Sequence, residues 1–291
     1  MLTQFIRLVR PHHWIKNFFL FAPLIFSKNL LEWPLLLLSV RAFISFCLVS
    51  GAVYTLNDLF DAPYDRLHPV KKDRPIASGR ISRLQAVLLA AALLVPAAFL
   101  ASELDGRFQL VLALYFLINL LYSVKLKDIV IIDAMIVSLG FMLRVIAGAY
   151  VIDVVLSEWI IMCTFFISLF LSFSKRRAEL AFQQLNDPGN TREVLREYSI
   201  SLVDQIILVC AAGALISYGL YTLADRTVRI FGTDNLIYTT IFVAYGIFRY
   251  LYLIHRKQLG ENPTLLILTD VPLLSNILLW IGTCVFIIYW G

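Results

Sequence analysis

Charged residues and cysteines are scarce in this chain, and their scarcity excludes most classes of soluble protein. Only 15% of the 291 residues are charged, whereas 60% are hydrophobic and the mean hydropathy is +0.80. A soluble domain carries about 25% charged residues and at most about 50% apolar ones. The four cysteines lie in apolar stretches without metal-type spacing, so neither a disulfide framework nor a cysteine–zinc site is expected. The composition predicts an all-helical membrane protein.

Long apolar runs recur along the sequence at lengths that suit membrane helices. A helix that crosses a bilayer needs about 20 mostly apolar residues. Such windows lie at 15–33, 35–56, 83–102, 108–123, 129–151, 157–174, 205–224, 235–254 and 267–290. The first is the weakest, because Pro23, Lys28 and Asn29 interrupt it. We therefore expect residues 1–291 to form a single domain of about nine transmembrane helices.

Basic residues are concentrated on one side of these predicted spans. The N-terminal tail and the loops after the second, fourth, sixth and eighth windows hold 18 of the 25 Lys and Arg residues. Cytoplasmic loops carry such an excess, which predicts a cytoplasmic N-terminus. The two long polar loops, 57–82 and 174–204, fall on the same side. Either a site is built there, or the basic residues only obey the topology rule and contact anionic lipid.

Acidic residues gather where the second apolar window ends, and membrane topology does not require them. Asn57, Asp61 and Asp65 recur every four residues, with Asp58 beside them, so on a helix the three share a face. Carboxylate oxygens suit Mg²⁺, which takes one or two of them together with water and phosphate oxygens. Pro63 is expected to end or kink the helix, which would place Asp65 off the Asn57–Asp61 face. Alternatively, Asn57 and Asp58 only cap or solvate the helix end.

Cations held between prolines follow the acidic residues directly. The segment HPVKKDRPIASG, residues 68–79, contains Lys71, Lys72 and Arg74. Carboxylates for a metal ion followed by fixed cations form an arrangement that grips a metal-bound diphosphate. Lys71 and Arg74 are therefore candidates for binding the phosphates of a donor substrate. His68, which stands beside a proline, is more typical of local packing.

The pattern NDxxDxxxD at a helix end, followed by RPxxSG, resembles the first signature of the UbiA superfamily of intramembrane prenyltransferases. The resemblance runs along almost the whole chain and implies a UbiA-type helical bundle with a cytoplasm-facing active-site cavity. Typical prenyltransferases of this group carry a second acidic motif, DxxxD, after the sixth helix. Here that stretch reads SKRRAEL, residues 174–180. The basic replacement argues against transfer of an isoprenyl chain from its diphosphate to an aromatic acceptor, which stays the alternative function.

The basic replacement matches a subfamily of the same group, the polyprenyl-phosphate phosphoribosyltransferases. The matching segments are RPHHWIKN (10–17), 57–79, YSVKLK (122–127), GFMLRVIAG (140–148), SEW (157–159) and KRRAEL (175–180). The resemblance implies Mg²⁺-dependent transfer of a 5-phosphoribosyl group from 5-phosphoribosyl 1-diphosphate to a polyprenyl phosphate of the decaprenyl type. It also implies a bacterial inner-membrane enzyme that supplies a pentose lipid for envelope polysaccharide, with no nucleic-acid partner. Whether the chain forms a homo-oligomer is left open.

Roles for individual residues follow from the motifs and the resemblance together. Asn57 and Asp61 are expected to be the metal-linked pair, with Asp58 and Asp65 as supporting or ribose contacts. Further polar residues, within the matching segments or, for Tyr54, one turn before the segment 57–79, are candidates for substrate binding: Lys16, Asn17, Tyr54, Lys71, Arg74, Tyr122, Lys125, Lys127, Lys175, Arg176 and Arg177. For Lys16, snorkelling to the membrane interface is the alternative. A non-catalytic lipid-phosphate carrier would need the basic residues but not the acids at 57–65.

Two ionisable residues, Asp133 and Arg144, fall inside the apolar window 129–151. Charge is costly within a bilayer, so such residues face a cavity or a partner. Eleven residues separate the two, which puts them on one face but about 16 Å apart along the helix, too far to pair directly. Gly140 and Gly148 share this face and leave room for close packing or a lipid chain. Both ionisable residues are substrate-binding candidates, with packing as the alternative role for Arg144.

Overall fold

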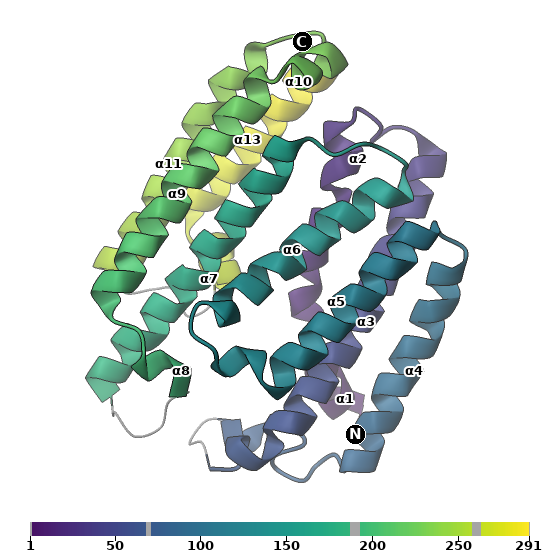
Figure 1. Cartoon of the computed structure of the whole chain (residues 1–291), viewed down its shortest axis with the longest axis vertical. Helices are drawn as coiled ribbons and strands as arrows, with labels where there is room; N and C mark the ends of the chain where they lie inside the picture. The colour runs from purple at the N-terminus through teal and green to yellow at the C-terminus, as the bar shows by residue number, and fades with distance from the viewer. Residues whose placement is uncertain (1, 68–70, 187–192, 258–262, 291) are drawn as a thin grey trace. The chain divides into compact units, whose positions relative to one another are not determined.

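The computed structural model describes residues 2–67, 71–186, 193–257 and 263–290, and all regular elements within these ranges are helical (Figure 1). His68 lies outside the described residues. The chain divides into two compact units, Met1–Val155 and Leu156–Gly291, which are described one after the other. That residues 1–291 form a single domain stays a prediction.

The first unit contains short helices at its N-terminus and four long helices. Its elements are α1 (Leu2–Val9), η1 (Pro11–Phe21), α2 (Ala22–Phe26), α3 (Trp33–Asp65), η2 (Lys71–Asp73), α4 (Arg83–Ser102), α5 (Gly106–Val124), η3 (Leu126–Asp128) and α6 (Ile132–Val151), where η marks a 3₁₀ helix. The second unit contains α7 (Glu158–Asn186), α8 (Glu193–Arg196), α9 (Ile200–Leu223), α10 (Asp225–Phe231), η4 (Asn235–Thr239), α11 (Thr240–Arg256), α12 (Pro263–Thr269) and α13 (Val271–Trp290).

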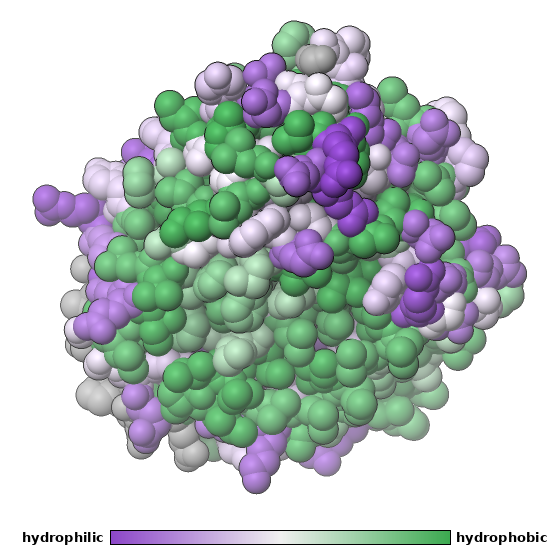
Figure 2. All heavy atoms as spheres, turned by 45° about the horizontal axis from the view of Figure 1, so that its top comes forward, coloured by the Kyte–Doolittle hydropathy of each residue, from purple (hydrophilic) through white to green (hydrophobic). Residues whose placement is uncertain are grey.

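Eight helical segments among the described residues are long and apolar enough to cross a membrane, and they coincide with eight of the predicted windows. The all-helical integral membrane protein predicted from composition is therefore confirmed. The first predicted window, 15–33, covers η1, α2 and the turn after them, and none of these is among the eight. Hydrophobic side chains cover much of the face seen in Figure 2, as expected for a surface in contact with lipid.

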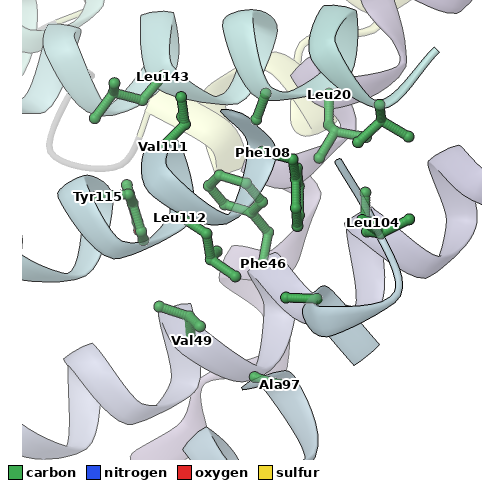
Figure 3. Packing of buried hydrophobic residues seen from close by; sticks show 14 of the residues in the cluster. Leu20, Phe46, Val49, Ala97, Leu104, Phe108, Val111, Leu112, Tyr115 and Leu143 are labelled. Atoms are coloured by element: carbon green, nitrogen blue, oxygen red, sulfur yellow. The ribbon is translucent and has the colours of Figure 1, made fainter. Parts of the chain in front are cut away.

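The core of the first unit is a cluster of hydrophobic residues from α3, α4, α5, α6 and η1 (Figure 3). The rings of Phe46 and Phe108 are both fully buried, and their centroids lie 5.9 Å apart in an edge-on arrangement. Tyr115 packs on the other side of Phe46, at 5.3 Å between ring centroids. Because Tyr115 also carries a hydroxyl group, this core connects the apolar packing with the polar residues described below.

Gly148 brings η1 close to α6. A Cβ atom at this position would lie 2.0 Å from the carbonyl oxygen of Leu20, which is closer than any side chain allows. Small residues at membrane helix interfaces permit such backbone approach. The predicted use of Gly148 for close packing is therefore confirmed, and the contact places Asn17 of η1 beside Arg144 of α6.

Helix α3 does not end at Pro63, so of the two outcomes expected for this proline, an end or a kink of the helix, the first is wrong. The helix passes through Pro63 and ends two residues later at Asp65. A proline removes one backbone hydrogen bond, here to Leu59, and this loss is smallest near a helix end. The last turn is stabilised by an ion pair of Asp65 with Arg74.

Candidate active site

The cytoplasmic end predicted for α3 carries two separate groups of polar side chains. Asn57 and Asp61 form the first, in which the Asn57 amide donates to Asp61 Oδ2 at 3.1 Å. The ammonium group of Lys127, from η3, forms an ion pair with the other oxygen of Asp61. Asp61 and Lys127 are each about one-sixth exposed, at 15% and 17%. The two residues predicted to hold a metal therefore lie side by side, with a cation against them.

Asp58 and Asp65 form the second group, on a neighbouring face of α3. Oδ1 of Asp58 accepts hydrogen bonds from Arg10 at 2.6 Å and from Arg74 at 3.3 Å. Arg74 also donates to Asp65 at 2.7 Å. Both carboxylates are buried, whereas the two arginines are about one-quarter exposed. Asp65 is thus held apart from Asn57 and Asp61 by its arginine.

The loop after α3 is folded back onto that helix. Arg66 donates to the carbonyl oxygen of Ala77 at 3.2 Å, and the Ser78 hydroxyl donates to that of Arg74 at 2.8 Å. Gly79 adopts a positive φ of 77°, which a glycine tolerates without strain. A second apolar cluster fixes the loop underneath: Leu8, Ala62, Ile76, Ile81 and Ala86. These contacts hold Lys71, which is half-buried in η2, and Arg74 at the end of α3.

Arg144 lies in a buried polar network of the first unit. Its guanidinium donates to Asn17 Oδ1 at 2.7 Å, to the Tyr115 hydroxyl at 2.8 Å and to the Gly140 carbonyl at 2.7 Å. The Tyr115 hydroxyl is 3.2 Å from Ser50 Oγ. No carboxylate pairs with Arg144 among the residues that the structure describes. Its positive charge is therefore uncompensated within this part of the chain, a condition that favours an anion nearby.

Lys16 stands in η1, outside the eight membrane-spanning helices, and precedes Asn17. Burial, together with the smaller effects of the positive charges of Arg144 and Arg10, lowers the pKa of Lys16 to about 8. The lysine therefore sits beside two other cations. Such a group of cations binds a phosphate, which restores the ordinary pKa of the ammonium.

The remaining candidates of the first unit occupy less connected positions. Tyr54 lies under Arg10, whose Cζ is 5.5 Å from the ring centroid. Tyr122 is half-buried near the end of α5, and Lys125 is exposed at its C-cap. Asp133 is fully buried in the first turn of α6, where the helix dipole favours a negative charge. Arg144 bonds to other partners, as the spacing from Asp133 predicted.

The three basic candidates of the second unit lie on α7 and are bonded to acids of that unit. Arg176 is buried and donates to Glu179 at 2.6 Å, and Lys175 lies 3.7 Å from the same carboxylate. Arg177 donates to Asp204 of α9 at 2.6 Å and to the Ile254 carbonyl of α11 at 3.0 Å. Arg177 therefore ties three helices together, whereas Lys175 is 44% exposed.

The donor set on α3 fits a magnesium ion that is shared with a substrate. No group of three His, Cys, Asp or Glu side chains converges within the described ranges. Asn57 and Asp61 are half-buried, one helical turn apart and joined by the hydrogen bond from the Asn57 amide nitrogen to Asp61 Oδ2. Mg²⁺ is commonly bound by one or two such protein oxygens, with phosphate and water oxygens completing its shell. The residues present are therefore compatible with this metal.

Three residues of the site were not predicted as functional residues from the sequence. Arg10 belongs to the segment RPHHWIKN, but its partner Asp58 is 48 positions away. Ser50 and Tyr115 lie inside apolar windows, where nothing in the local pattern separates them from residues that only pack. Their polar role depends on the position of Arg144 on another helix.

Comparison with known proteins finds relatives along the whole chain. A family model described as the UbiA prenyltransferase family matches residues 18–271. The decaprenyl-phosphate phosphoribosyltransferase of Mycolicibacterium smegmatis is 32% identical over 301 aligned positions, which cover 100% of this chain and 94% of the relative. A Corynebacterium glutamicum protein of the same name is 33% identical and covers 74% of this chain and 66% of its own length. The nodulation protein NoeC of Azorhizobium caulinodans is 29% identical over 96% of this chain and 92% of its own.

Solved structures with the same fold come from a UbiA homolog of Archaeoglobus fulgidus. The form bound to DMAPP and Mg²⁺ has a TM-score of 0.72 at 19% identity, covering 99% of this chain and 100% of that one. The form bound to GPP and Mg²⁺ also has a TM-score of 0.72, at 20% identity, covering 98% and 99%. The fold class predicted from the sequence is therefore confirmed.

Proposed function

Because this chain belongs to the UbiA prenyltransferase family, we propose that it transfers a 5-phosphoribosyl group from 5-phosphoribosyl 1-diphosphate to a polyprenyl phosphate. The lipid acceptor is of the decaprenyl type, and diphosphate is released. The observation that carries the proposal is the charge arrangement: one acidic site on α3 is surrounded by cations, and α7 carries KRRAEL where a prenyltransferase has a second acidic motif. The names of the relatives support the same transferred group and acceptor.

We assign the donor to the end of α3. Asn57 and Asp61 hold a magnesium ion, and the chemistry that Mg²⁺ supplies when bound is neutralisation of charge on the diphosphate oxygens. Lys127, Lys71 and Arg74 bind the remaining oxygens of the donor as hydrogen-bond donors and positive charges. Asp58 and Asp65 keep Arg74 in place through their ion pairs. Tyr54, within α3 one turn before Asp58, and Tyr122 and Lys125, at the end of α5, are proposed substrate contacts.

The reaction breaks the bond between the anomeric carbon and the diphosphate, through a transition state with oxocarbenium character comparable to that of glycoside cleavage. The electron pair of that bond leaves with the diphosphate, and an oxygen of the lipid phosphate forms the new bond. Because this nucleophile is already an anion, no side chain has to remove a proton. The protein contributes positive charge at the leaving group and alignment of the two substrates.

We assign the acceptor phosphate to the cations around η1 and α6. Arg144 is buried without a carboxylate partner in the described chain, and Lys16 stands near it, so an added phosphate would neutralise both. Asn17 supports Arg144 through its hydrogen bond, and Asp133, at the other end of α6, is proposed as a separate substrate contact. In the second unit, we propose Lys175 as a phosphate contact, whereas Arg176 and Arg177 act through their ion pairs. The active site faces the cytoplasm of a bacterial inner membrane, and the product supplies pentose for envelope polysaccharide.

The proposal is tested by product formation. Purified protein is incubated with Mg²⁺, 5-phosphoribosyl 1-diphosphate labelled in the ribose, and decaprenyl phosphate, and the lipid phase is analysed by thin-layer chromatography and mass spectrometry. A labelled lipid that disappears when EDTA chelates the metal is the expected result. Labelled product formed only from DMAPP or GPP and an aromatic acid would make the chain a prenyltransferase instead. Acceptor binding without any product under either condition would indicate a lipid-phosphate carrier.

A further inference from the structure

Arg10 has a backbone conformation that its position at a helix end does not justify. It lies between α1 and η1 with φ 52° and ψ 60°, in the left-handed region. Residues other than glycine, asparagine and aspartate rarely adopt this conformation, because their Cβ atom then approaches the carbonyl oxygen. Helix ends of this kind usually carry glycine. An arginine that tolerates this strain therefore needs a role beyond ending α1.

The need to neutralise the charge of Asp58 does not explain why residue 10 is an arginine. Asp58 is 2% exposed and already has Arg74 as a partner, at 3.3 Å from its Oδ1 atom. Arg10 binds the same oxygen at 2.6 Å, so two guanidinium groups meet at one carboxylate atom. Like charges this close repel each other, and additional negative charge beside them is stabilising. Asp65 supplies part of that charge, but only to Arg74.

The two arginines also keep hydrogen-bond donors for a further ligand. Arg10 bonds Asp58 through a single nitrogen, and Arg74 uses a single nitrogen for both of its carboxylates. No other hydrogen bond from either guanidinium group is made to the residues described in the structure. The side chains of Arg10 and Arg74 are 21% and 26% exposed, so a solute has access to them.

The orientation of Arg10 is fixed from two sides. The Tyr54 ring lies 5.5 Å from Arg10 Cζ, and Asp58 follows Tyr54 by one turn of α3. The ring and the carboxylate together hold the guanidinium group over the face of α3 that carries Asp58, which neighbours the face of Asn57 and Asp61. A planar guanidinium group held in this way binds two oxygens of a phosphate at once.

We propose that Arg10 and Arg74 form a clamp on the diphosphate of the donor, and that Asp58 is the positioning residue that holds both guanidinium groups. This inference rests on the proposed function, because it takes the donor to be a diphosphate ester. It adds Arg10 to the donor-binding residues and gives Asp58 a role through the arginines rather than through the metal or the ribose.

The clamp is tested by exchanging Arg10 for residues that suit its backbone. Arg10→Asn and Arg10→Gly both accept the left-handed conformation and remove the cation. We expect each variant to keep the melting temperature of the wild type, to raise KM for the donor about tenfold and to change kcat less than about threefold. KM for the lipid acceptor is expected to stay unchanged.

Lys28→Asn is the matched control. Lys28 also has a positive φ, 63°, and its side chain is exposed. The same exchange of a basic residue for asparagine in the same backbone region is expected to leave both KM values unchanged. A rise in the donor KM of this control equal to that of Arg10→Asn would overturn the clamp, because loss of any basic residue would then produce it.

Binding of pyrophosphate separates the clamp from the proposed transfer reaction. Titration calorimetry in the presence of Mg²⁺ should show pyrophosphate binding that weakens about tenfold in Arg10→Asn and in Asp58→Asn, with a less than additive loss in the double variant. This result supports the clamp even if the wild type makes no labelled lipid, an outcome that contradicts only the proposed function. Ribose 5-phosphate is titrated in parallel. The clamp would be overturned if Arg10→Asn and Arg10→Gly left the affinity for pyrophosphate unchanged, including the case in which they weakened only the affinity for ribose 5-phosphate. Unchanged affinity in Asp58→Asn would overturn the positioning role.

Discussion

The two units use their charged side chains differently. At the end of α3, Asp58 and Asp61 are each bonded to a cation from a distant segment: Arg10 is 48 residues from Asp58, and Lys127 is 66 residues from Asp61. On α7, Arg176 and Lys175 are bonded to Glu179 within one helical turn, and of the three basic candidates only Arg177 reaches another helix, through Asp204. Pairs within a turn are formed by the helix itself, whereas pairs between distant segments require the fold to bring the charges together. Partly exposed cations gathered in this second way are typical of a binding site.

The largest effect is expected from removing the acid that is predicted to hold the metal in the first unit. Asp61→Ala should lower the transfer rate roughly 1,000-fold, because both the metal ligand and the partner of Lys127 are lost. The rate is measured by formation of the labelled lipid at saturating Mg²⁺. Asp73→Ala, the same exchange at an exposed position of η2, is the control and should keep the wild-type rate. A rate within about tenfold of the wild type in Asp61→Ala would contradict the assignment.

The second unit should respond in stability rather than in substrate binding. Asp204→Ala leaves Arg177 without its carboxylate between α7, α9 and α11 and should lower the free energy of unfolding by about 1–2 kcal/mol. Thermal unfolding in detergent, followed by circular dichroism, measures this loss. Replacing both partners by apolar residues, in Arg177→Met with Asp204→Leu, should recover much of it. Normal stability with a large rise in the donor KM would instead place Arg177 among the substrate ligands.

The charge of Lys16 should make binding of the lipid acceptor to the first unit depend on pH. Its pKa of about 8 means that the free enzyme loses this positive charge between pH 7 and 9. A bound phosphate raises that pKa, so binding is strong below pH 8 and weakens above it, and KM for the lipid acceptor should rise about tenfold from pH 7 to pH 9. Lys16→Arg keeps its charge throughout this range and should remove the rise. The same pH profile in both proteins would assign the titration to another group.

The smallest effect is expected at Lys175. Its side chain is 44% exposed and its contact with Glu179 is 3.7 Å long, so Lys175→Ala should raise the acceptor KM only about threefold and leave the melting temperature unchanged. Lys257→Ala, at the exposed C-cap of α11, is the control and should change neither quantity. A loss of stability in Lys175→Ala would show that the contact with Glu179 is structural.

Parts of the site that lie within one helix were predictable from the sequence. The spacing of Asn57 and Asp61 placed both on one face, and the structure brings them within hydrogen-bond distance. The eleven-residue interval between Asp133 and Arg144 excluded a direct pair, and Arg144 has other partners. Helical periodicity determines these relations without reference to the rest of the chain.

The expected end of the helix at Pro63 was wrong for a physical reason that lies outside the helix, whereas the alternative, a kink, stays a prediction. The local rule weighs only the lost hydrogen bond and the steric clash of the proline ring. In the structure the next turn is also held by the ion pair of Asp65 with Arg74, which comes from the loop beyond. A contact between segments therefore outweighed the local preference.

Composition, apolar windows and motif spacing by themselves determined that this protein is helical, crosses a membrane and carries an acidic site at the end of its second predicted span. These properties depend on residues within a few turns of each other, because helix formation and partition into lipid are local. Only the tertiary structure decided which cation forms an ion pair with which acid. It placed Arg144 in hydrogen bonds with Asn17 and Tyr115, and it brought Arg10 to Asp58. Those pairs join helices far apart in the chain, and their geometry follows from how the helices pack against one another.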